Sequence, residues 1–134
     1  MGETMILPVT LTAAAAAAIL SIWLMVRVGQ VRTSEKVSIG DGGNEHVIRR
    51  MRAHANFVES APFVLALLAV IELSGKGAVW LPYVAGAYFI GRILHAFGME
   101  AEGFAKGRFI GTIVTFLTLL GLAIVATLIA MGVM

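Results

Sequence analysis

The fold of this chain is decided by the stretch RRMRAHANFVESAPF, residues 49–63. It begins as a basic segment and continues, without a turn signal, into an apolar run. At about 100° per residue, its polar side chains fall within one narrow stripe of an α-helix. The residues of this stripe are Arg49, Arg52, Asn56 and Glu59. The pattern predicts a helix that carries polar groups into a membrane, where such groups are costly and mark a binding site.

The composition is that of a membrane protein. The chain has 134 residues, of which 59% are hydrophobic and 13% charged, whereas roughly a quarter of the residues of a soluble domain are charged. Its length predicts a single domain, residues 1–134. Because there is no cysteine, thiol chemistry would need a thiol supplied by a ligand. Six of the ten Lys and Arg residues lie between Arg27 and Arg52, which indicates a local basic surface and no nucleic-acid partner.

The apolar segments predict an all-α, integral membrane four-helix bundle. Residues 4–26 are uncharged and long enough to cross a bilayer. Because the N-terminal segment lacks the basic residues of a signal peptide, we expect this helix to remain in the mature protein. Residues 29–45 resemble a loop, and Asn44 is expected to cap a second helix that ends near Ser74. Two further helices are expected at 77–97 and 109–134.

The distribution of basic residues predicts the orientation. The first loop with its flanks holds six Lys and Arg residues, and the last link with its flanks holds Arg92, Lys106 and Arg108. The opposite side holds only Lys76. We therefore expect the basic loops in the cytoplasm and both termini on the other side.

A candidate polar site lies near the predicted cytoplasmic end. Its residues are Arg32 after the first helix, Arg52, Asn56 and Glu59 on the second, Arg92 and His95 on the third, and Arg108 at the start of the fourth. Guanidinium groups bind carboxylates, and a lone acid binds an ammonium group. An arginine at a helix N-terminus stabilises an anion or a thiolate.

Structural roles remain open for several of these residues. Arg52 and Glu59 can equally form ion pairs that hold helices together in lipid. Arg49 and Arg50 are typical of contacts with lipid headgroups. His95 is expected to be a hydrogen-bonding partner, and the three histidines do not have a metal-binding spacing.

Several motifs resemble those of the MAPEG proteins, the membrane-associated proteins in eicosanoid and glutathione metabolism. The segment RAHANFVE, residues 52–59, followed by Ala61-Pro62-Phe63, resembles the signature of that family. GQVR at 29–32 is similar to the end of its first helix, and GRILH at 91–95 to its third-helix motif. Arg108 lies where the catalytic arginine of its enzymes is expected. The short chain is most similar to bacterial members.

The resemblance implies a homotrimer in the bacterial inner membrane, with glutathione bound between neighbouring subunits. The residues implied to hold its carboxylates, amides and amine are Arg32, Arg52, Asn56 and Glu59, with Arg92 and His95 lining the same cleft. Arg108 would stabilise the thiolate, which attacks or reduces a lipophilic electrophile that arrives from the bilayer. The expected activity is that of a glutathione transferase or peroxidase.

Two departures and two alternatives accompany this expectation. Family enzymes often have a polar residue in place of Ala55, and several have a tyrosine in place of Met99. A non-catalytic trimer that binds a lipid or another ligand is therefore an alternative. A small transporter subunit is a third hypothesis, but the charged residues cluster at one end and form no relay across the bilayer.

Overall fold

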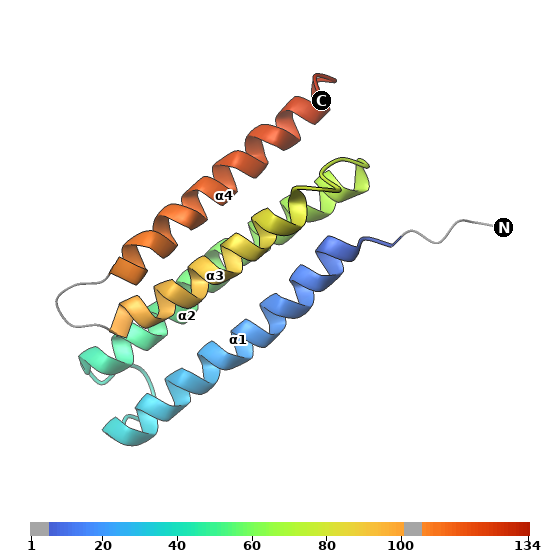
Figure 1. Ribbon diagram of the computed structural model, residues 1–134. Coiled ribbons are helices and arrows are strands. Elements are labelled where there is room, and N and C mark those ends of the chain that lie inside the picture. Colours follow the sequence, from blue (N-terminus) through green and yellow to red (C-terminus); the bar gives the residue numbers. More distant parts are fainter. Residues whose placement is uncertain (1–5, 101–105) are drawn as a thin grey trace.

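The chain forms an up-and-down bundle of four helices, and no strand occurs among the residues described by the computed structural model, 6–100 and 106–134. The helices are α1 (Pro8–Glu35), α2 (Glu45–Leu73), α3 (Leu81–Glu100) and α4 (Lys106–Ala130). Figure 1 shows α2 and α3 in the middle, with α1 and α4 on either side. Within the described residues, α1 and α4 do not touch. The predicted all-α fold is confirmed.

Three of these helices, α1, α2 and α4, are long and apolar enough to cross a membrane. The 20 residues of α3 also reach roughly 30 Å at about 1.5 Å per residue. α3 carries Arg92 and His95, and both side chains are buried against the neighbouring helices. The chain is therefore a membrane protein whose third helix holds the most deeply buried polar groups.

The helix boundaries differ from the prediction at several places, and the largest difference lies at the end of α1. We predicted a loop from Gly29 onward, and this is wrong, because α1 continues to Glu35. A Cβ atom added at Gly29 would meet nothing within 4 Å, and a single glycine weakens a helix without ending it. The helix ends where Lys36 adopts a left-handed conformation with φ 58°. The predicted helix from residue 77 begins instead at Leu81, after a turn.

The start of α2 was predicted correctly. The Asn44 side chain accepts hydrogen bonds from the backbone N–H groups of His46 and Val47, at 2.9 and 3.2 Å. This cap satisfies donors that the first turn of a helix leaves free. It fixes where α2 begins, and therefore which of its residues face the bundle.

Glycines bring α3 and α4 into very close contact. A Cβ atom added at Gly98 would lie 2.0 Å from the backbone nitrogen of Arg108, and one added at Gly107 would lie 2.4 Å from the Leu94 carbonyl oxygen. A Cβ atom at Gly111 would lie 2.4 Å from the Gly91 carbonyl oxygen. Small residues permit this approach between membrane helices. The contact fixes the position of Arg108 relative to α3.

Candidate functional site

A buried guanidinium group lies at the centre of the candidate site. Arg92 on α3 is 2% exposed. Its Nη1 donates to Thr115 Oγ1 on α4 at 2.9 Å, and its Nη2 donates to Asn56 Oδ1 on α2 at 2.6 Å. Nη2 also lies 3.2 Å from His95 Nδ1. Arg92 thus connects three helices, and the predicted residues Asn56, Arg92 and His95 lie together.

Arg92 has no acidic partner within residues 6–100 and 106–134. Its Nε atom is buried and makes no hydrogen bond there. A charge in the interior of a membrane bundle is costly unless dipoles or an opposite charge compensate it. The hydroxyl of Thr115 and the amide of Asn56 supply dipoles, so the site keeps a net positive charge.

The polar stripe of α2 divides into two halves. Arg49 and Asn56 point toward α3, since Arg49 donates to the Met99 carbonyl oxygen at 3.3 Å and Asn56 accepts from Arg92. Arg52 and Glu59 are exposed. Neither of these two side chains makes a hydrogen bond or ion pair to another residue that the structure describes.

The exposed half of the stripe is surrounded by apolar side chains. Val58 and Phe63 on the same helix are 48% and 66% exposed. A face that combines such residues with the charges of Arg52 and Glu59 suits neither lipid nor water. Such a face is typical of a surface that binds a partner with both polar and apolar groups.

Arg32 lies at the end of α1 and is held against the first loop and α2. Its Nη1 donates to the Gly40 carbonyl oxygen at 2.6 Å, and its Nη2 lies 3.6 Å from the sulfur of Met51. These contacts keep Arg32 on the side of the bundle opposite α4. The structure does not bring Arg32 and Arg108 together within one chain.

Arg108 lies in the first turn of α4 and is exposed. Its backbone packs on Gly98, next to Met99, whose carbonyl oxygen accepts from Arg49. Arg108 and the basic start of α2 therefore lie at the same depth, about two turns from Arg92. The N-terminus of α4 adds the positive end of the helix dipole at this point.

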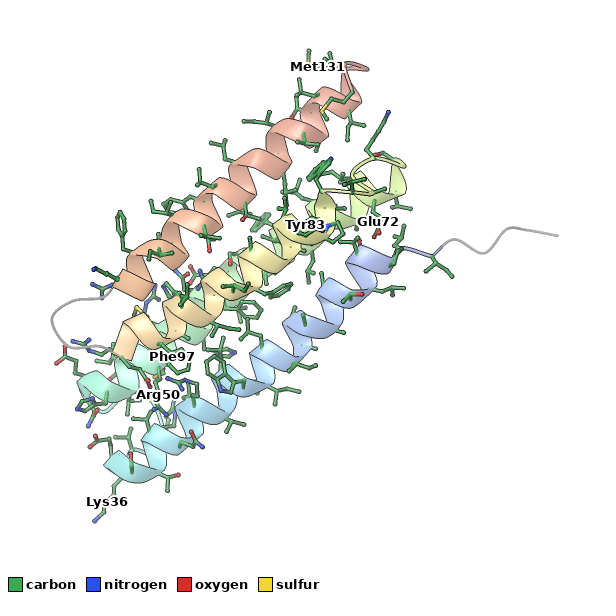
Figure 2. All side chains as sticks on the ribbon, in the orientation of Figure 1. Lys36, Arg50, Glu72, Tyr83, Phe97 and Met131 are labelled. Carbon is green, nitrogen blue, oxygen red and sulfur yellow. The ribbon has the colours of Figure 1, made fainter. Side chains whose placement is uncertain are left out.

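A second polar cluster, which we did not predict, ties three helices together at the same end. Glu100 on α3 forms ion pairs with Arg27 on α1 and Arg50 on α2. The Arg27 guanidinium carbon also lies 4.7 Å from the Trp23 ring centroid and 4.9 Å from that of Phe97. Figure 2 shows Arg50 and Phe97 at this end of the bundle. The spacing of Trp23 and Arg27, four residues apart on one helix, is the signal that indicates such a contact.

Comparison with known proteins identifies the family. No curated protein and no solved structure shows significant similarity to this chain. The MAPEG family model matches residues 10–128, a range that includes nearly all of α1, all of α2 and α3, and most of α4. The predicted resemblance is confirmed, and the chain belongs to the MAPEG family.

Proposed function

We propose that this protein is a glutathione-dependent membrane enzyme that acts on lipophilic electrophiles. One observation carries the proposal: arginine and glutamate side chains that have no partner among the described residues lie in the same half of an apolar bundle as a buried cation. Arg52, Glu59 and Arg108 are exposed there, and Arg92 is buried at the depth of Asn56, which lies between Arg52 and Glu59 along α2. Glutathione offers two carboxylates, an ammonium group and two amides, which these side chains complement.

The roles of the residues follow from their chemistry and position. Arg52 and Arg32 would hold carboxylates, and Glu59 would accept from the ammonium group. Asn56 and His95, which surround Arg92, would line the deeper part of the same cleft. Each of these side chains complements a group of glutathione, and the MAPEG family includes glutathione-dependent transferases and peroxidases as well as non-catalytic members.

Arg108 would supply the electrostatic part of catalysis. Its guanidinium and the N-terminus of α4 both favour an anion, so the thiol of bound glutathione would lose its proton to solvent more readily. The thiolate sulfur would then form a bond with an electrophilic carbon of a substrate dissolved in the bilayer, and the bond from that carbon to its leaving group would break, so that the group departs with the electron pair as an anion such as halide. The protein itself has no cysteine, so the ligand must provide this sulfur.

The test compares glutathione binding and conjugation of a generic aryl halide by the wild type, Arg108→Ala and Lys106→Ala. Lys106→Ala is the matched control, since it removes a positive charge from the same helix end. We expect Arg108→Ala to raise the pKa of the bound thiol by about 1 or more, as followed by the ultraviolet absorbance of the thiolate against pH. The conjugation rate near neutral pH should fall by about tenfold or more.

Two results would contradict the proposal. If the wild type neither binds glutathione nor turns over the electrophile, the protein is not an enzyme of this kind. If Arg108→Ala retains the wild-type pH profile, the role assigned to Arg108 is wrong.

A non-catalytic member that binds a lipid or another ligand is the second candidate. It is favoured by Met99, which occupies the position where several family enzymes have a tyrosine. Met99 offers the site only its backbone carbonyl, which already accepts from Arg49. Glutathione binding without any turnover would support this candidate.

A further inference from the structure

An apolar groove runs along the face between α1 and α3. The part that ends at Trp23 has a volume of about 370 Å³ and is lined by Ala16, Ile19, Leu20, Trp23, Phe89 and Ile93. A second hollow of about 590 Å³ shares Ala16 and Phe89 with the first and continues to Pro8 and Pro82. Each volume falls within the range of small-molecule sites, about 300–1,000 Å³. The two hollows form one groove that reaches from the start of α1 to Trp23.

The packing of α1 explains why this groove is open. Ala17 is buried against the core, whereas Ala16 lines both hollows of the groove. Its methyl group is too small to fill the space opposite Phe89, so α1 packs on α2 and leaves α3 partly uncovered. From Pro8 to Trp23 the groove is about 22 Å long at about 1.5 Å per residue. It is therefore longer than half of the roughly 30 Å hydrocarbon core of a bilayer.

The groove has a cationic end. Beyond Trp23, the Arg27 guanidinium stacks on the rings of Trp23 and Phe97. Arg27 and Arg50 share the single carboxylate of Glu100, so this cluster carries one uncompensated positive charge. The Arg50 side chain is 23% exposed, whereas the Arg27 side chain is 13% exposed and its Nη2 atom is buried, so Arg50 offers an anion the more accessible guanidinium. Guanidinium groups bind phosphate oxygens well, in a geometry that lysine does not offer.

We propose that this groove is a binding site for an anionic phospholipid. One acyl chain lies between α1 and α3, and the phosphate and anionic headgroup lie at Arg27 and Arg50. The length and apolar lining of the groove fit an acyl chain, and the charge at its end selects the headgroup. The lipid undergoes no reaction and fills the space that Ala16 leaves open. This site is separate from the proposed glutathione cleft, and its test involves no glutathione.

Quenching of Trp23 fluorescence tests this proposal. The chain has two tryptophans, so Trp80→Phe leaves Trp23 as the sole tryptophan, which is excited selectively at wavelengths that tyrosine does not absorb. The full-length protein is reconstituted in phosphatidylcholine vesicles that contain increasing amounts of phosphatidylglycerol with brominated acyl chains. Matched vesicles contain phosphatidylcholine with the same bromination. We expect half-maximal quenching at about fivefold less brominated phosphatidylglycerol than brominated phosphatidylcholine, since each arginine near a headgroup favours an anionic lipid by that order.

Three further substitutions, each made in the Trp80→Phe protein, test the acyl-chain part and the headgroup part of the site separately. Ala16→Leu fills the groove and should reduce quenching by both lipids, whereas Ala14→Leu adds the same atoms at an exposed position outside the groove and should change nothing. Arg27→Gln leaves Glu100 paired with Arg50 alone, so the preference for phosphatidylglycerol should disappear. If Arg27→Gln does not fold, as judged by circular dichroism, Ala16→Leu still decides whether the groove is occupied.

Two outcomes would overturn the proposal. Equal quenching by the two lipids in the reference protein would mean that Trp23 meets bulk bilayer without selecting a lipid. Absence of quenching by either lipid would mean that a neighbouring copy of the chain covers the groove.

Discussion

Arg92 is a buried cation, and no carboxylate among the described residues neutralises it. The neighbouring side chains must therefore stabilise its charge. Asn56 and Thr115 do so with single oxygen atoms from two different helices. Each hydrogen bond to a charged group contributes about 1.5–3 kcal/mol, and its loss leaves the guanidinium less satisfied. We therefore regard these contacts as the main polar link among α2, α3 and α4.

Replacing Asn56 with leucine should destabilise the bundle. Asn56→Leu keeps the approximate volume but removes the Oδ1 atom that accepts from Arg92 at 2.6 Å. We expect a loss of about 1–3 kcal/mol in the free energy of unfolding. The measurement is thermal unfolding in detergent micelles, followed by circular dichroism.

Val58→Leu, at an exposed position of the same helix, should change stability by less than about 0.5 kcal/mol. Equal melting temperatures for the two variants would show that Arg92 does not depend on Asn56.

At the scale of helices, glycines decide how α3 and α4 meet. Gly111→Ala places a methyl group 2.4 Å from the Gly91 carbonyl oxygen and 2.6 Å from the Cβ atom of His95. Because backbone atoms cannot give way locally, the two helices must separate, at a cost of about 1–3 kcal/mol.

The matched control is Gly121→Ala on the same helix, where an added Cβ atom meets nothing within 4 Å. This variant should leave stability unchanged or raise it by up to about 1 kcal/mol, because alanine favours helix. Chemical unfolding in mixed micelles gives both values. A Gly111→Ala protein as stable as the wild type would contradict the close packing.

At the opposite end of the bundle, a carboxylate of α2 caps α1. Glu72 accepts hydrogen bonds from the backbone N–H groups of Val9 and Thr10, each at 2.8 Å, and Figure 2 shows it beside the start of α1. A negative charge at this position also complements the helix dipole. The cap therefore fastens the first turn of α1 to the end of α2.

Removing this cap should loosen the first turn of α1. We expect Glu72→Ala to increase hydrogen exchange at the amides of Val9 and Thr10 by about fivefold or more, corresponding to roughly 1 kcal/mol. Glu72→Gln keeps one acceptor oxygen and should show an intermediate rate. Unchanged exchange in Glu72→Ala would mean that these amides are satisfied in another way.

At the scale of the whole molecule, one chain does not bring all the candidate residues together. Arg32 lies at the end of α1, and Arg108 at the start of α4, and these two helices do not touch within the described residues. If both arginines serve one glutathione, the cleft must lie between two subunits. The exposed polar face of Arg52 and Glu59 fits the same arrangement.

Mixed oligomers test this arrangement. Arg32→Ala and Arg108→Ala subunits should each be nearly inactive when they assemble alone. In the homotrimer that we propose, assembled at random from equal amounts of both subunits, about a quarter of the interfaces combine an intact Arg32 with an intact Arg108. We therefore expect about a quarter of the wild-type conjugation rate. No recovery of activity in purified mixed trimers would place both arginines in the same subunit. Glutathione binding without activity in any form would instead fit the non-catalytic alternative.

Local patterns in the sequence predicted much of this structure. The four apolar segments, the Asn44 cap and the pairing of Arg92 with His95 on one helix face all depend on residues close together in the chain. The end of α1 was predicted wrongly. Gly29 predicts a loop when only neighbouring residues are considered, although the helix continues past it. The division of the stripe, with Asn56 inside and Glu59 outside, was also missed, because both fall within the same arc of α2.

The sequence alone determined that this chain is an all-helical membrane protein of the MAPEG type, because spans and motifs are properties of continuous segments. Only the tertiary structure decided which charges meet. Glu100 is shared by Arg27 and Arg50, residues more than 20 positions apart, and Arg92 lies between Asn56 and Thr115 of two other helices. These contacts depend on the angles and distances at which helices pack, and those follow from side-chain volume and from glycines such as Gly98 and Gly111, not from local periodicity.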